Sequence, residues 1–186
     1  MKKTKLAIFD LDGTLFDTTE CNFQAYRQAC KESHVNIDRE YYESKCHSKN
    51  YKVFMPSLVG DNIELREKIH DRKIELYPSF LGTAKVNKHL FKIIESLRPS
   101  YRIAIATTAS RQNAEAILRH FGKLSLFEML VCGEDAEKTK PNPECFLKVM
   151  EFFNMSPENT VIFEDSEIGI QAATATKSTV MVIEQF

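Results

Sequence analysis

The stretch that decides the fold of this chain is Leu6-Ala7-Ile8-Phe9-Asp10-Leu11-Asp12-Gly13-Thr14. Its apolar first half is short and continuous, which is typical of a strand buried on both faces. Asp10 and Asp12 lie two residues apart at the end of that strand, so their side chains point to the same side of the backbone. Gly13 lets the chain turn sharply and brings backbone N–H groups near both acids. The stretch therefore predicts a place that holds a divalent cation and positions a carboxylate to attack phosphorus.

Beyond residue 85, short apolar runs alternate with patterns of helical spacing. The expected strands are 5–10, 102–106, 129–132, 161–163 and 180–183. The expected helices between them are 86–97, 111–121, 143–153 and 167–176. Alternating strands and helices indicate an α/β fold with a doubly wound parallel sheet.

Residues 16–80 interrupt this alternation with a polar segment of helical character. Asp38, and either Asp61 or Asn62, are typical helix N-caps within it. The segment is too long for a loop in a compact domain. We therefore expect two domains, a core formed by residues 1–15 and 81–186 and an inserted helical domain formed by residues 16–80.

The composition narrows the class of protein. The 186 residues carry a net charge of −1, which gives no electrostatic reason to expect a nucleic acid or a membrane surface as partner. The apolar stretch near the N-terminus is too short for a signal peptide, and none in the sequence is long enough to span a membrane. We therefore expect a cytoplasmic protein, present as a monomer or weak dimer.

Polar and charged residues follow four successive predicted strands. In order along the chain they are Asp10 and Asp12, Thr107 and Thr108, Lys140, and Glu164 and Asp165. Ligands of open α/β sheets bind outside the carboxyl ends of the strands, so these side chains are expected to meet at one edge.

With these motifs in this order, the sequence resembles the haloacid dehalogenase superfamily of phosphotransferases over nearly its whole length. It is similar to the branch of phosphoglycolate phosphatases and β-phosphoglucomutases, in which a helical C1-type cap follows the first motif. The Asp-x-Asp-Gly-Thr motif, residues 10–14, is the most specific of the four. The resemblance implies a Rossmann-like core and a Mg²⁺-dependent phosphatase. Its substrate would be a small phosphomonoester, such as a sugar phosphate or a phosphoglycolate-like metabolite.

The same resemblance implies a role for each catalytic residue. Asp10 would be the nucleophile that becomes an aspartyl phosphate, and Asp12 the general acid and base. Thr107 would hydrogen-bond a phosphoryl oxygen, and Lys140 would neutralise charge that develops on the phosphoryl group. Simpler interpretations remain open at this stage, since Thr107 and Thr108 could cap the helix at residue 111 and Lys140 could be a solvated loop residue.

The expected ligands of Mg²⁺ are the Asp10 carboxylate, the backbone carbonyl of Asp12, and Asp165. Glu164 would lie beside Asp165 or one shell further out. Glu164 and Asp165 could instead be charges that complement the dipole of the following helix.

Further residues are expected to bind substrate. They are Leu11, Gly13 and Thr108 in the core, and Lys45, His47 and Lys49 in the inserted domain. Tyr41 and Tyr42 are candidates for substrate specificity. A solvated polar surface is an equally good interpretation of the stretch from residue 45 to residue 49.

Three alternatives to a phosphatase remain. A dehalogenase would need neither Asp12 nor the acids at 164 and 165. The second is a phosphomutase, because the form Glu164-Asp165-Ser166-x-x-Gly169 resembles the branch of the family that contains both the mutases and the sugar phosphatases. However, the mutases carry a histidine where this chain has Asn22, and a Gly-x-x-Arg where it has lysines around residue 47. The third alternative is a non-catalytic binding module that keeps the fold.

Overall fold

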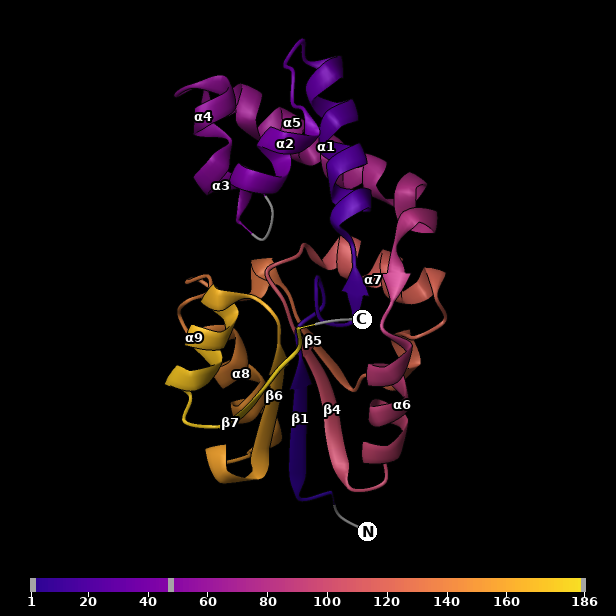
Figure 1. Ribbon diagram of the computed structural model, residues 1–186. Coiled ribbons are helices and arrows are strands. Elements are labelled where there is room, and N and C mark those ends of the chain that lie inside the picture. The colour runs from indigo at the N-terminus through magenta and orange to yellow at the C-terminus, as the bar shows by residue number, and fades with distance from the viewer. Residues whose placement is uncertain (1–2, 47–48, 185–186) are drawn as a thin grey trace. The chain divides into compact units, whose positions relative to one another are not determined.

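The computed structural model describes residues 3–46 and 49–184 of the chain (Figure 1). The chain forms two compact units. Met1–Asp17 together with Lys85–Phe186 form the core unit, and Thr18–Ala84 form the helical unit.

A short antiparallel ladder sets the boundary between the two units. Strand β2, Phe16–Asp17, pairs with β3, Lys85–Val86, in the register Phe16 with Val86 and Asp17 with Lys85. The ladder ties both connecting segments to the core unit. The helical unit therefore begins and ends a few residues later than the expected bounds, 16 and 80.

The core unit is built on a parallel sheet with the strand order β5-β4-β1-β6-β7 among the described residues. The strands are β1 Lys5–Phe9, β4 Tyr101–Ala106, β5 Met129–Val131, β6 Thr160–Glu164 and β7 Thr179–Val182. From β1 the chain adds strands on one side and then returns to add strands on the other. This order confirms the predicted doubly wound α/β fold, and it places the end of β1 at the switch point, where such sheets bind ligands.

Helices cover both faces of this sheet, with α8 and α9 on one side and α6 on the other (Figure 1). The helices of the core unit are α6 Lys88–Leu97, α7 Arg111–His120, α8 Glu144–Phe153 and α9 Glu167–Ala175. Because successive strand residues point to opposite faces, Leu6 and Ile8 of β1 pack with Phe146 of α8 and Ala172 of α9. Short 3₁₀ turns occupy Leu124–Leu126, Gly133–Asp135 and Pro157–Asn159.

The helical unit packs its two longest helices, α1 Thr19–Glu32 and α5 Ile63–Leu76, against each other. Shorter segments complete it: α2 Arg39–Tyr41, a π-helical turn Tyr42–Cys46, α3 Tyr51–Phe54, α4 Pro56–Val59 and a 3₁₀ segment Tyr77–Thr83. Its core is rich in aromatic side chains such as Phe23, Tyr26 and Phe54.

Side-chain caps begin several of these helices. The predicted caps are confirmed at Asp38, which accepts from the Tyr41 N–H at 2.7 Å, and at Asn62, which accepts from the Leu65 N–H at 3.0 Å. Such caps satisfy amide donors that have no partner within the helix. Within the described part of the chain, no helix combines the length and apolar character needed to cross a membrane.

Candidate active site

Four of the predicted site residues lie at the carboxyl ends of adjacent strands. Asp10 follows β1, Thr107 follows β4, and Glu164 and Asp165 end and follow β6. The sheet places β1 between β4 and β6, so these ends are neighbours. Parallel pairing therefore brings together residues that are far apart in the sequence.

Lys140 lies at the centre of this group. Its ammonium donates to Asp10 Oδ1 at 2.6 Å, to Glu164 Oε1 at 2.7 Å and to the Ala106 carbonyl at 3.1 Å. Three acceptors match the three N–H donors of an ammonium group. The Lys140 side chain is only 3% exposed, so it is not a solvated loop lysine.

Glu164 has hydrogen-bond donors around both of its carboxylate oxygens. While Oε1 accepts from Lys140, Oε2 accepts from the N–H groups of Asp165 and Ser166, each at 2.8 Å, and from Ser166 Oγ at 3.1 Å. A Cβ at Gly169 would stand 1.8 Å from Glu164 Oε1, so the first turn of α9 must carry glycine there. Glu164 is thus held in place through Oε2 while its Oε1 binds Lys140, as expected of a residue that positions the lysine.

The loop after β1 approaches Asp165 closely. Gly13 has φ +92°, and its N–H donates to the Phe16 carbonyl at 2.7 Å. A Cβ at Gly13 would stand 2.1 Å from Asp165 Oδ2. Glycine is required here both by the backbone conformation and by the neighbouring carboxylate. The turn expected from the sequence is therefore also a close approach between two loops.

Burial and nearby charges shift the pKa values of two acids of this group, Asp10 and Asp165. Burial raises the pKa of Asp10 well above its usual range, with Lys140 opposing the shift and Glu164 and Asp165 adding to it. Burial also raises the pKa of Asp165 to about 6. Burial lowers the pKa of Lys140, but Asp10 and Glu164 outweigh that effect, so its pKa is raised and it stays charged. Three carboxylates thus surround one cation, and the group carries an excess of negative potential when all of them are ionised.

These donors fit Mg²⁺. Asp10 and Asp165 offer hard oxygen ligands, and their mutual repulsion is relieved by a cation. In residues 3–46 and 49–184, no three side chains of His, Cys, Asp or Glu form a group that could hold a metal ion. Mg²⁺ is commonly held by one or two carboxylates and completes its shell with water and phosphate oxygens, so Asp10 and Asp165 are sufficient in number.

The threonines after β4 do not cap the next helix. Thr107 is buried, its N–H donates to the Val131 carbonyl at 2.9 Å, and its hydroxyl accepts from the Ala109 N–H at 3.1 Å. Ser110 caps α7 instead, accepting from the Asn113 N–H at 3.3 Å. Thr108 is exposed. The alternative that these threonines serve as caps is therefore wrong.

The other predicted residues of the core unit lie in the loop after β1. Leu11 is buried, and its carbonyl accepts from the N–H groups of Leu15 and Phe16, each at 3.0 Å. Asp12 and Gly13 are partly exposed. Substrate binding by Leu11 and Gly13 stays a prediction.

The predicted residues of the helical unit have different surroundings. Lys45 and Lys49 are exposed, and His47 lies outside the described residues. Tyr42 is buried, with its ring centroid 5.4 Å from that of Phe23. Tyr42 therefore belongs to the core of the helical unit, and its role in specificity stays a prediction.

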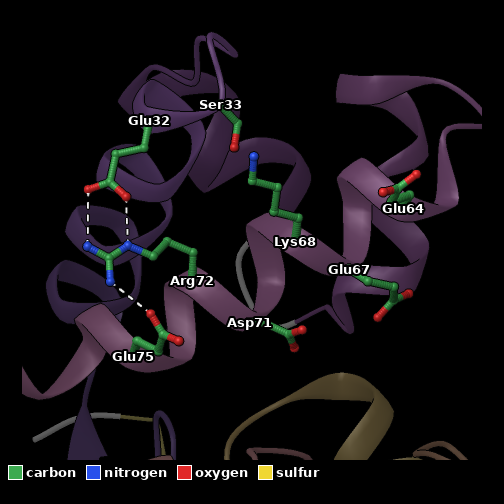
Figure 2. Close-up of a pocket in the computed structure, with 8 residues that line it drawn as sticks. All are labelled: Glu32, Ser33, Glu64, Glu67, Lys68, Asp71, Arg72 and Glu75. Carbon is green, nitrogen blue, oxygen red and sulfur yellow. Dashed lines mark hydrogen bonds and ion pairs between the residues drawn. The ribbon is translucent and has the colours of Figure 1, made fainter.

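A hollow of about 600 Å³ on the helical unit holds none of the predicted site residues (Figure 2). It is lined by Ser33 and by charged side chains of α1 and α5, of which Arg72 forms ion pairs with Glu32 and Glu75. The residues that line the hollow are all different from those of the group around Lys140.

The sequence did not reveal the contacts of Thr14, Ser166 and Gly169, although all three stand inside quoted motifs. The available signals were local: Ser166 three residues before Gly169 is a typical N-cap, and it accepts from the Gly169 N–H at 3.2 Å. The contact between Thr14 and Asp165, at 2.7 Å, joins residues 151 positions apart, and no local pattern announces it.

Comparison with known proteins identifies relatives over nearly the whole chain. A family model described as haloacid dehalogenase-like hydrolase matches residues 7–183. A phosphorylated carbohydrates phosphatase from Thermotoga maritima is 30% identical, over 89% of this chain and 78% of the relative. A β-phosphoglucomutase from Bacillus subtilis is 28% identical, over 90% and 78%. The crystal structure of CbbY from Rhodobacter sphaeroides in complex with phosphate has a TM-score of 0.87 and 25% identity, over 98% of this chain and 87% of that chain.

Proposed function

Because this chain belongs to the haloacid dehalogenase-like hydrolase family, we propose that it is a Mg²⁺-dependent phosphatase that hydrolyses a small phosphomonoester through an aspartyl phosphate. Its similarity to a phosphatase of that family supports the same activity that its sequence motifs indicate. The observation that carries the mechanism is the buried contact of Lys140 with Asp10 and Glu164 beside Asp165. A sugar phosphate is the favoured substrate class, because the relative from T. maritima is named for phosphorylated carbohydrates.

Asp10 is assigned the attack on phosphorus. Lys140 holds its Oδ1, so Oδ2 forms the new bond to phosphorus while the bond from phosphorus to the alkoxide breaks. In the second half, water attacks the phosphorus of the aspartyl phosphate, the bond to Oδ2 breaks, and inorganic phosphate leaves. Burial disfavours the ionised form of Asp10 that this chemistry needs, and the fixed charge of Lys140 opposes that penalty.

Asp12 is assigned both proton transfers. It lies two residues after the nucleophile and is partly exposed, so its carboxyl group can face the ester oxygen and the incoming water. In the first half it donates its proton to the leaving alkoxide. In the second half it takes a proton from the attacking water, which restores the starting state.

Lys140 and Thr107 are assigned to the phosphoryl oxygens. Lys140 is fixed by three acceptors before substrate arrives, so its charge needs no reorganisation during the reaction. Thr107 is held by the backbone at the end of β4, and its hydroxyl hydrogen is assigned to a phosphoryl oxygen.

Asp10, the Asp12 carbonyl and Asp165 would hold Mg²⁺. When bound, the ion would reduce the repulsion between the attacking carboxylate and the phosphate anion. We assign Glu164 to the positioning of Lys140, since both of its oxygens already accept hydrogen bonds within the protein.

A phosphomutase is the second candidate, because the β-phosphoglucomutase of B. subtilis is among the relatives. The position at which the mutases carry histidine holds Asn22, whose side-chain amide donates to the hydroxyl and carbonyl of Thr18 at 3.0 and 3.2 Å. Parallel assays of phosphate release and of sugar-phosphate isomerisation separate the two activities. Isomerisation with little released phosphate would favour the mutase.

The nucleophile is tested with Asp10→Asn, assayed with Mg²⁺ on a panel of phosphorylated sugars and small phosphate esters. Asp61→Asn, at an exposed position of the helical unit, is the matched control. We expect Asp10→Asn to reduce phosphate release by at least about a thousandfold, and the control to match wild type. Full turnover by Asp10→Asn would exclude Asp10 as nucleophile.

A further inference from the structure

Thr14 makes a contact that the proposed mechanism does not use. It is fully buried, and its hydroxyl donates to Asp165 Oδ1 at 2.7 Å. A hydrogen bond from a buried hydroxyl to a carboxylate of this length is among the stronger kinds. Thr14 therefore holds one oxygen of a residue that is assigned to the cation.

The other oxygen of Asp165, Oδ2, lies against Gly13, the residue before Thr14. Asp165 Oδ2 occupies the space where a side chain at position 13 would stand, 2.1 Å from the position of a Cβ. The carboxylate is thus fixed at Oδ1 by a donor and placed at Oδ2 beside Gly13, the residue that follows the Asp12 carbonyl. Two consecutive residues of one loop determine how Asp165 is oriented.

The backbone of Thr14 is itself held by Asn87. The buried Asn87 donates from its side-chain amide to the Thr14 carbonyl at 3.2 Å, and from its backbone N–H to the Leu15 carbonyl at 3.0 Å. Asn87 also caps α6, accepting from the Leu90 N–H at 3.0 Å. The N-cap of α6 therefore fixes the backbone that carries the Thr14 hydroxyl.

We propose that Thr14 is a positioning residue of the cation site, whose hydroxyl fixes Asp165 Oδ1 and so presents the rest of the carboxylate to Mg²⁺ beside the Asp12 carbonyl. This inference rests on the proposed function, because it assigns Asp165 to Mg²⁺. Outer partners of metal ligands orient those ligands, and their loss typically weakens metal binding about 10- to 100-fold.

The test compares Thr14→Val, which removes the hydroxyl at nearly constant volume, with Thr14→Ser, which keeps it. Thr14→Ala removes the hydroxyl without β-branching and serves if the valine variant does not fold. Thr160→Val is the matched control, since Thr160 is also buried and donates to the Ser156 carbonyl at 2.9 Å, at the other end of β6 from Glu164. Titration calorimetry measures Mg²⁺ binding to each protein without substrate, and circular dichroism verifies folding.

We expect Thr14→Val and Thr14→Ala to bind Mg²⁺ about 10- to 100-fold more weakly, with Thr14→Ser and Thr160→Val close to wild type. In turnover assays, the Mg²⁺ concentration for half-maximal rate should rise for Thr14→Val, while kcat at saturating Mg²⁺ stays near wild type. Wild-type affinity in both folded variants that lack the hydroxyl would overturn the inference and leave the proposed function intact. If wild type neither binds Mg²⁺ nor releases phosphate from the ester panel, the proposed function fails and the inference fails with it.

Discussion

Two groups of ion pairs in this protein have nearly the same geometry in very different surroundings. Lys140 meets Asp10 and Glu164 at 2.6 and 2.7 Å in the core unit. Arg72 meets Glu32 and Glu75 at 2.6 and 2.8 Å on the helical unit (Figure 2). The Lys140 side chain is 3% exposed, whereas that of Arg72 is 42% exposed. The comparison shows that ion pairs with similar distances can differ widely in how far they are exposed to solvent.

Surroundings determine what each group can do. Exposed charges are solvated and screened, so an ion pair between them adds little. A buried charge needs its partner, because loss of the partner leaves an uncompensated charge in a medium of low polarity. The group around Lys140 is therefore rigid and dependent on each of its members, which suits a site that must hold charges in place. The group around Arg72 is a feature of a solvated surface.

Replacement of Lys140 by methionine should have the largest effect. It leaves Asp10 and Glu164 buried without their cation, so we expect a loss of about 3–5 kcal/mol in the free energy of unfolding. Phosphate release should fall to background in the same variant. Denaturant unfolding and the ester panel measure the two effects. Wild-type stability in a folded Lys140→Met protein would show that the comparison between the two groups is wrong.

A methyl group at position 169 should have the next largest effect. Gly169→Ala places a Cβ 1.8 Å from Glu164 Oε1, so either the carboxylate or the first turn of α9 must move. Such overpacking typically costs about 1–3 kcal/mol, and the displaced Glu164 should lower the rate of phosphate release. Gly82→Ala is the control, because no atom lies within 4 Å of the Cβ it would add. Equal stability and rate in the two variants would contradict the tight fit of Glu164.

His70 of α5 offers a test by pH. Its ring stacks on Tyr51 at 3.5 Å and its Nδ1 lies 3.3 Å from the Tyr26 hydroxyl. Burial, assisted by Lys73 and opposed by Glu67, lowers its pKa to about 4.

A histidine with a depressed pKa in the folded state stabilises the protein fully above its unfolded pKa, about 6.5, and loses that contribution as the pH falls toward 4. We expect a loss of about 1 kcal/mol between pH 6.5 and 4, because partial exposure reduces the effect of the shift. Thermal unfolding of wild type and His70→Gln across this range measures it. An identical pH dependence in the two proteins would show that His70 does not titrate as described.

The smallest effect is expected at Arg72. Arg72→Met removes both exposed ion pairs and should leave the thermal unfolding midpoint within experimental scatter of wild type, with unchanged phosphate release. Arg72→Met and Lys140→Met each replace a cationic side chain by methionine, the first at an exposed position and the second at a buried one. A large loss of stability in Arg72→Met would show that exposure does not separate the two groups.

The sequence predicted the fold because the strands of the core are short apolar runs that are followed by polar or charged residues. The expected strand 5–10 is observed as Lys5–Phe9, and the expected helix 167–176 as Glu167–Ala175. Parallel order also predicted that Asp10, Lys140 and Glu164 share one edge of the sheet, and Lys140 contacts both acids. Position along the chain was informative here because Asp10 and Glu164 lie at the ends of strands, and Lys140 lies in the segment that leads from β5 to α8.

Other features left no local signal. The ladder of β2 and β3 is two residues long on each strand, too short for any periodicity, so the domain boundary was misplaced. The burial of Tyr42 depends on how α1 and the following turns pack together, and the residues that follow it, 43–45, are polar and exposed. The partners of Glu164 depend on loop geometry after the strands have paired. Residue type predicted charge at these places, but only the fold determined which atoms meet.

The ladder of β2 and β3 also has a consequence for the chain as an engineering scaffold. Its two strands carry the chain out of the core unit and back at neighbouring points, about 4.8 Å apart as in any sheet. A two-residue hairpin turn bridges the same gap. Residues 18–84 are thus attached as a separate insertion, and we expect a graft of different length or shape at this junction to leave the spacing of β1, β4 and β6 unchanged.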